Sequence, residues 1–260
     1  MMTTRDIRAN VDTITFSREI NEDRAMAAGW DRYLTDTDKQ LLRKTRWAKH
    51  AAFGLGTKPA LLIIDAYYGT LGLPRKPLLD IVDEWPAACG TTGWDAIDAT
   101  VPLLEQARLA DVPVYFLTGL AANPNPWNRK RAGRPRPAPT IPASHQIVDE
   151  LKPRDGEFVL EKCSPSGFAT TGLDALLRAQ GCDTLIVCGE ATSGCVRATV
   201  VDGCVAGYSV GIVSDCCFDR IEASHWMNLF DMDQKYGDVI DSAAALDYLA
   251  AVSHAAQIEV

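Results

Sequence analysis

The sequence predicts an α/β protein of three layers, with a Rossmann-like, mostly parallel six-stranded sheet between two layers of helices. Short apolar runs rich in Val, Ile and Leu alternate along the chain with segments of helical periodicity. Such alternation is typical of parallel sheets whose strands are joined by right-handed crossovers. A chain of 260 residues with 47% hydrophobic content can also bury a full core. The predicted strands are residues 60–65, 112–118, 157–160, 184–188, 208–213 and 238–240.

Helical patterns fill most of the connections between these strands. Apart from the helix that begins at Cys195, the predicted helices are residues 94–110, 172–181, 223–235 and 242–252. In the helix from Cys195, the residues Val196, Thr199 and Val200 recur at helix-like intervals. No internal repeat interrupts this order, so we expect one α/β domain.

The first 52 residues differ from the rest because they are charged and only weakly periodic. Residues 36–50 have a helical pattern with Thr35 or Asp36 as the N-cap. We therefore expect an N-terminal arm at residues 1–52, which covers the domain or contacts another subunit, and a single domain at residues 53–260. With such a contact segment we expect a homo-oligomer, either a dimer or a tetramer.

The composition excludes several classes of partner. A net charge of -8 argues against nucleic acid or an anionic membrane as the main partner. No apolar run approaches the length of a membrane span, and residues 1–15 lack the apolar core of a signal peptide. The eight cysteines are interpreted as reduced thiols of a cytoplasmic protein. The four histidines show no paired ligand spacing, so we expect no metal site.

Two long connections stand out. Residues 71–93 contain three prolines and several glycines, and connections of this length usually form lids or contact surfaces. Residues 121–143 carry a basic run at 129–131, followed by Arg134 and Arg136. A nucleic-acid patch is one interpretation, but in an acidic protein we favour a solvated surface or a rim that attracts anions.

Three potentially reactive side chains follow predicted strands. Asp65 ends one buried apolar run, Lys162 comes just after another, and Cys195 follows the strand at 184–188. Taken singly, the acid could cap a turn, the lysine could be an exposed surface residue and the cysteine could merely pack. Because the carboxyl ends of parallel strands meet at one edge of a sheet, we expect the three to converge there.

Cys195 is placed where a strand ends and a helix begins. The first N–H groups of a helix are unpaired, and the helix dipole makes this end positive. A thiol at such a position can lose its proton at a lower pH than a free cysteine. The same N–H groups could hold a negative oxygen formed on a substrate carbonyl. A dinucleotide-binding interpretation is disfavoured, because Gly54-x-Gly56 precedes its strand and no helix follows it.

Three motifs in this order resemble the signatures of the isochorismatase-like cysteine hydrolases. They are IID at 63–65, EK at 161–162 with S-x-F at 166–168, and GEATSGCVR at 189–197. The tail at residues 228–239 and Asp219-Arg220 are similar to the subgroup of N-carbamoylsarcosine amidases and maleamate amidohydrolases. The resemblance covers about residues 53–252 and implies the isochorismatase-like hydrolase fold.

The resemblance also implies a role for each matching residue. Cys195 would be the nucleophile, Asp65 the general base and Lys162 their partner. The peptide bond between Glu190 and Ala191 would be cis, which would direct the N–H of Ala191 to the same point as that of Cys195, as an oxyanion hole. Arg220 matches the position that in this subgroup grips a substrate carboxylate. No metal or other cofactor is implied, because the zinc ligands of the nicotinamidase branch have no counterparts in this sequence.

The sequence departs from the family pattern beside these motifs. The departures are residues 66–68 after the acid, 163–165 after the lysine, and the long connection at 71–93. They leave the substrate undefined.

We therefore expect a cysteine-dependent amidohydrolase that acts on a small carboxylate-bearing amide or N-carbamoyl compound and releases ammonia through a thioester. The alternatives are a maleamate or ureido-acid amidohydrolase of the same fold, and a non-catalytic protein in which Cys195 is a thiol sensor.

Overall fold

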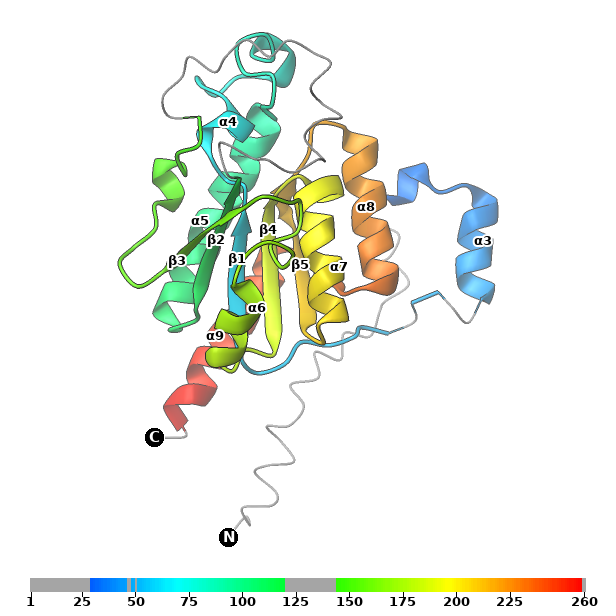
Figure 1. Ribbon diagram of the computed structural model, residues 1–260. Coiled ribbons are helices and arrows are strands. Elements are labelled where there is room, and N and C mark those ends of the chain that lie inside the picture. Colours follow the sequence, from blue (N-terminus) through cyan, green and yellow to red (C-terminus); the bar gives the residue numbers. More distant parts are fainter. Residues whose placement is uncertain (1–28, 46–47, 50, 120–143, 259–260) are drawn as a thin grey trace.

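The computed structural model describes residues 29–45, 48–49, 51–119 and 144–258. Within them, six parallel strands form one sheet in the order β3-β2-β1-β4-β5-β6, with helices on both faces (Figure 1). The strands are β1 (Pro59–Ile64), β2 (Val114–Gly119), β3 (Phe158–Lys162), β4 (Thr184–Glu190), β5 (Ser209–Phe218) and β6 (Asp238–Ile240). The predicted three-layer α/β fold with six strands is confirmed.

The helices follow the predicted alternation with the strands. The longer ones are α3 (Asp36–Lys44), α5 (Thr91–Leu109), α6 (Leu173–Ala179), α7 (Arg197–Val205), α8 (Glu222–Lys235) and α9 (Ser242–Ile258). A one-turn helix α4 (Tyr68–Leu71) follows β1, and a π-helical turn η5 (Thr192–Val196) joins β4 to α7. This turn moves the start of the regular helix from the predicted Cys195 to Arg197.

The side chains of β1 alternate between two apolar cores. Leu61 and Ile63 pack with α5 and α9 on one face, whereas Leu62 and Ile64 pack with α6, α7 and α8 on the other. Because both faces are covered, this strand is apolar throughout, as in buried parallel sheets. The packing fixes the central strands and so fixes the direction in which their carboxyl ends point.

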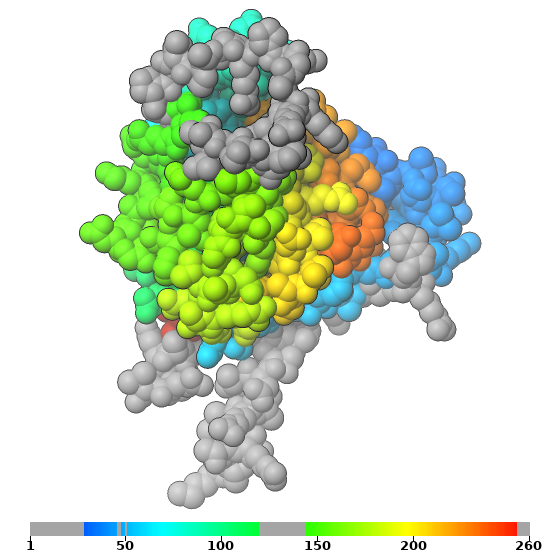
Figure 2. Space-filling model, in the orientation of Figure 1, coloured from blue at the N-terminus to red at the C-terminus, as the bar shows by residue number. Residues whose placement is uncertain are grey.

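The described part of the N-terminal arm packs along α8. Trp30 and Phe230 lie edge to face with ring centroids 6.2 Å apart. Lys49 is buried between Asp233 and Asp238, at 2.8 and 2.6 Å. Figure 2 shows the blue segment of the arm next to the orange α8. In this part of the chain the arm contacts its own domain.

Thr35 caps α3, as one of the two predicted N-cap residues, through a reciprocal capping box with Asp38. The helix ends at Lys44, earlier than the predicted residue 50. The basic run at 129–131, with Arg134 and Arg136, lies outside the described residues. The connection at 71–93 is described, and it runs from α4 to α5 over the carboxyl edge of the sheet (Figure 1).

Candidate active site

The candidate site lies at the carboxyl ends of the two central strands, β1 and β4. The chain builds β1, β2 and β3 outward in one direction and β4, β5 and β6 in the other. The crevice between β1 and β4 is therefore the topological switch point, where ligands of open α/β sheets bind. Asp65 directly follows β1 and Cys195 follows β4, so the two flank this crevice.

Asp65 is held at the first position after β1. Its backbone N–H donates to Leu117 O at 2.8 Å, and its carbonyl accepts from Thr70 Oγ1 at 2.7 Å. Its φ of 50° lies in the left-handed region, which aspartate tolerates better than most residues. The side chain is buried, and its Oδ1 atom has no hydrogen-bond partner within the described residues. An oxygen of this kind can accept a proton.

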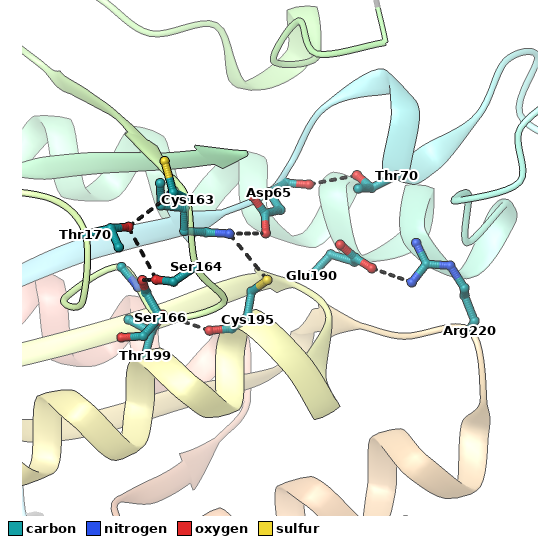
Figure 3. A network of polar contacts seen from close by, with 12 residues as sticks. Asp65, Thr70, Cys163, Ser164, Ser166, Thr170, Glu190, Cys195, Thr199 and Arg220 are labelled. Atoms are coloured by element: carbon teal, nitrogen blue, oxygen red, sulfur yellow. Dashed lines mark hydrogen bonds and ion pairs between the residues drawn. The ribbon is translucent and has the colours of Figure 1, made fainter. Parts of the chain in front are cut away.

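Lys162 connects Asp65 to the thiol of Cys195, and both of these residues are labelled in Figure 3. It is the last residue of β3, whereas the sequence predicted it just past the end of that strand, and it is 4% exposed. Its Nζ atom donates to Asp65 Oδ2 at 2.7 Å and to Cys195 Sγ at 3.3 Å. The structure thus brings together all three side chains that the sequence placed at strand ends.

The charges of this group are coupled. Burial alone would lower the pKa of Lys162, but the attraction of Asp65 and Cys195 outweighs burial and raises it. Burial raises the pKa of Asp65, and the ammonium of Lys162 opposes that rise. The lysine therefore stays cationic beside the carboxyl group.

The expectation that Cys195 has a lowered pKa is wrong for the free protein. Burial, followed by the negative charge of Asp65, raises the pKa of the thiol to about 12, although Lys162 opposes this. Desolvation of the thiolate outweighs the start of a helix two residues further on. A thiol with a pKa this high is protonated near neutral pH, and it could act as a nucleophile only with the help of a base.

The turn before Cys195 has the backbone that the resemblance implies. The peptide bond between Glu190 and Ala191 is cis. Before it, Gly189 has a φ of 113°, and a Cβ atom there would lie 2.0 Å from Ile64 O. Only glycine fits this close approach of β4 to β1. Of the two predicted oxyanion-hole residues, Ala191 directly precedes η5 and Cys195 lies within it.

The side chain of Arg220 pairs with an acid that is distant from it in the sequence. Its Nη1 atom donates to Glu190 Oε1 at 2.5 Å. Its Nη2 atom donates to the carbonyl of Ala87, in the connection at 71–93. Asp219 accepts from the backbone N–H and hydroxyl of Ser193.

Two residues at the site were not assigned a role from the sequence. Glu190 is the last residue of β4 and is 6% exposed; burial is the main cause that raises its pKa to about 7. Burial is the largest cause that raises the pKa of the Tyr67 phenol. The nearby charges of Asp65, Glu190 and Cys195 raise it further. An acid directly after the apolar run of β4 was the available signal for Glu190.

Other kinds of site are not found in the part of the chain that the structure describes. Its His, Cys, Asp and Glu side chains form no cluster of three or more suited to a metal ion. None of its helices is long and apolar enough to cross a membrane.

The comparison with known families supports the resemblance. Residues 59–244 match the family described as the isochorismatase domain. The chain belongs to this family. The family's fold accounts for the parallel sheet, and the carboxyl edge of that sheet carries the three side chains described above.

Two named relatives of this chain are amidohydrolases. Maleamate amidohydrolase of Pseudomonas putida is 35% identical over 198 residues, which cover 75% of this chain and 89% of the relative. N-carbamoylsarcosine amidase of an Arthrobacter species is 32% identical over 203 residues, or 70% of this chain and 74% of the relative. The crystal structure of N-carbamoylsarcosine amidase from Thermoplasma acidophilum aligns with a TM-score of 0.58 at 26% identity, over 71% of this chain and 96% of that one.

Proposed function

We propose that this protein is a cysteine-dependent amidohydrolase that cleaves a small, carboxylate-bearing linear amide or N-carbamoyl compound and releases ammonia. The observation that carries the proposal is the position of Lys162 Nζ, 2.7 Å from Asp65 and 3.3 Å from the Cys195 thiol. A nucleophile, a base and a cation that joins them are the parts that acyl transfer from an amide requires. The names of the relatives support the same bond type.

The first half of the reaction uses Asp65 as the base. Its unpartnered Oδ1 atom accepts the thiol proton while Sγ of Cys195 attacks the amide carbon. The carbonyl oxygen becomes negative and accepts hydrogen bonds from the N–H groups of Ala191 and Cys195. As the C–N bond breaks, Asp65 returns the proton to the nitrogen, ammonia leaves and a thioester remains.

The second half consumes one water molecule. Asp65 takes a proton from the water, whose oxygen attacks the thioester carbon. The C–S bond breaks, the thiol recovers the proton from Asp65, and the acid leaves. Throughout, Lys162 offsets negative charge that passes between the carboxylate and the sulfur, which would otherwise repel each other. The steps need no cofactor.

At the substrate end, we assign the carboxylate to Arg220. A guanidinium can bind a carboxylate through two parallel hydrogen bonds. Arg220 lies on the same sheet edge as Cys195, and Glu190 is drawn between the two residues in Figure 3. The second candidate of the same fold is a maleamate or ureido-acid amidohydrolase, which the 35% identity to maleamate amidohydrolase favours.

Ammonia release from a panel of small amides tests the proposal. The panel contains N-carbamoylsarcosine, other N-carbamoyl amino acids, maleamate, ureidoacrylate and nicotinamide. We expect at least one carboxylated member to be hydrolysed and nicotinamide to be a poor substrate. A thiol sensor would release no ammonia from any of them, and that result would reject the enzymatic assignment. The fastest acid decides between the two candidates.

We further propose that residues 1–52 are an arm on one hydrolase domain at 53–260. The contacts of Trp30 and Lys49 with α8 support the arm as a cover of the domain.

A further inference from the structure

The Arg220 guanidinium already holds a carboxylate of its own chain. Glu190 Oε1 accepts from Nη1 at 2.5 Å, and the carbonyl of Ala87 accepts from Nη2. The side chain of Glu190 is 8% exposed and that of Arg220 is 31% exposed, so the pair sits where solvent screens it weakly. The positive charge available to an arriving anion is therefore largely cancelled while Glu190 is ionised.

The surroundings of Glu190 make the ionised form costly. The titratable groups that interact with it electrostatically include Asp65, Tyr67, Cys89, Cys195, Asp219 and Arg220. Of these, Arg220 alone supplies a positive charge. Lys162 lies beyond Asp65 and Cys195 and donates to both. Burial is the largest cause that raises the pKa of Glu190 to about 7, and the negative charge of Asp65 adds to it. The carboxyl group can thus change its charge near neutral pH.

A carboxylated substrate would place a second anion beside this pair. If Glu190 stayed ionised, two carboxylates would share one guanidinium near the carboxyl group of Asp65, which is unfavourable at a buried site. If Glu190 takes up one proton, the guanidinium keeps its full charge and its remaining N–H donors for the substrate. A neutral substrate has no such requirement.

We propose that Glu190 is a specificity-determining residue that competes with the substrate carboxylate for Arg220, so that carboxylated amides bind together with one proton. This inference rests on the proposed function for its substrate class. It assigns Glu190 no role in bond breaking: the residue sets which substrates bind and at which pH.

The test compares the fastest acid of the panel with its methyl ester between about pH 6 and about pH 9. Above the pKa of Glu190, KM of the acid should rise up to about tenfold per pH unit, because each binding event takes up a proton. The KM of the ester should lack this rise, because a neutral substrate does not require Glu190 to take up a proton. Titration of Asp65, Lys162 and Cys195 affects both substrates alike, so the comparison of the two KM values isolates Glu190. Equal pH dependence of both KM values in the unmodified enzyme would overturn the proposal.

Two variants sharpen the result. Glu190→Gln keeps the shape but removes the charge, so KM of the acid should follow the same pH dependence as KM of the ester and fall about tenfold or more at about pH 8. Glu222→Gln removes one exposed carboxylate two residues from Arg220, and it should leave the KM profile unchanged. A similar change in both variants would indicate a general effect of net charge and would overturn the role of Glu190.

Calorimetry on the Cys195→Ala protein separates this inference from the proposed chemistry. Binding of the acid at about pH 8, measured in two buffers of different ionisation enthalpy, should show uptake of about one proton. Adding Glu190→Gln should abolish the uptake. Proton-linked binding without any ammonia release by the unmodified enzyme would reject the proposed function alone. Binding without proton uptake, in an enzyme that does release ammonia, would reject the role of Glu190 alone.

Discussion

Lys162 donates a 2.7 Å hydrogen bond to Asp65, and the side chains of both are only 4% exposed. A buried ion pair costs desolvation that its attraction only partly repays. It follows that the pair contributes little net stability. Its position beside the thiol of Cys195 instead suits chemistry in which a proton leaves sulfur and negative charge moves between two atoms.

Replacing the thiol should abolish activity without loss of the fold. Cys195→Ala and Cys195→Ser should each lower kcat by about a thousandfold or more, because neither offers a comparable nucleophile. The melting temperature should stay close to that of the unmodified protein. Ammonia release and thermal unfolding measure the two effects. Near-normal turnover in Cys195→Ala would assign the nucleophile to another residue; Cys163→Ala, the half-buried neighbour of Lys162, is the matched control.

Asp65→Asn should remove both the proton acceptor and the negative charge beside the thiol of Cys195. Loss of the proton acceptor should slow turnover by about a hundredfold or more. At the same time the pKa of Cys195 should fall below about 12, because the carboxylate that raises it is gone while Lys162 remains. The rate of Cys195 alkylation against pH, mapped by mass spectrometry, measures that pKa. A thiol whose pKa is unchanged in this variant would contradict the coupling.

Lys162→Met should move the pH profile upward. Without the ammonium that opposes burial, the pKa of Asp65 rises further, so the base is ionised only at higher pH. The acidic limb of kcat/KM should shift to higher pH, and the maximum rate should fall. Stability at neutral pH should drop by about 3–5 kcal/mol, the usual cost of breaking a buried pair.

The sign of the pH dependence provides a second test of Lys162→Met. Since the folded-state pKa of Asp65 lies above its unfolded value, protonation at low pH stabilises the folded variant. The stability deficit should shrink as pH falls toward about 5 and grow as pH rises through the pKa of Asp65. Denaturant unfolding at several pH values measures it. A deficit that is independent of pH would show that packing, not charge, is lost.

Arg220→Ala should weaken carboxylated substrates selectively. Charge-assisted hydrogen bonds contribute about 1.5–3 kcal/mol each, so losing a pair of them should lower kcat/KM by about a hundredfold or more. The methyl ester should be almost unaffected. Because Arg220→Ala strands the carboxyl group of Glu190, the double variant Arg220→Ala/Glu190→Gln is the control. Equal losses for acid and ester in that double variant would show that Arg220 does not bind the substrate carboxylate.

The arm should depend on Lys49. Its ammonium is buried between Asp233 and Asp238, so Lys49→Met should destabilise the protein by about 3 kcal/mol or more. Lys39→Met is the matched control, since the pair of Lys39 with Asp31 is more exposed and should contribute about 1 kcal/mol or less. Chemical unfolding of the two variants gives the comparison. Equal losses would mean that burial of Lys49 is not what ties the arm to α8.

Local patterns determined most of the fold. The apolar run before Asp65 and the alternation of strands with helices predicted the parallel sheet, because a strand buried on both faces must be apolar throughout. The ends of β1 and β4 differ from prediction by a residue or two, since strand and helix ends depend on hydrogen bonds that sequence patterns describe poorly. The π-helical turn at Cys195 is such a case.

The sequence alone placed Asp65, Lys162 and Cys195 after strands, and parallel topology then required them to share one edge. Only the tertiary structure decided their electrical state and the partner of Arg220. The raised pKa of Cys195 comes from burial and from Asp65, which is far away in the chain. The pairing of Arg220 with Glu190 joins residues from the ends of two neighbouring strands. Desolvation and long-range charge depend on which side chains surround a group in space, and residue order along the chain does not encode that directly.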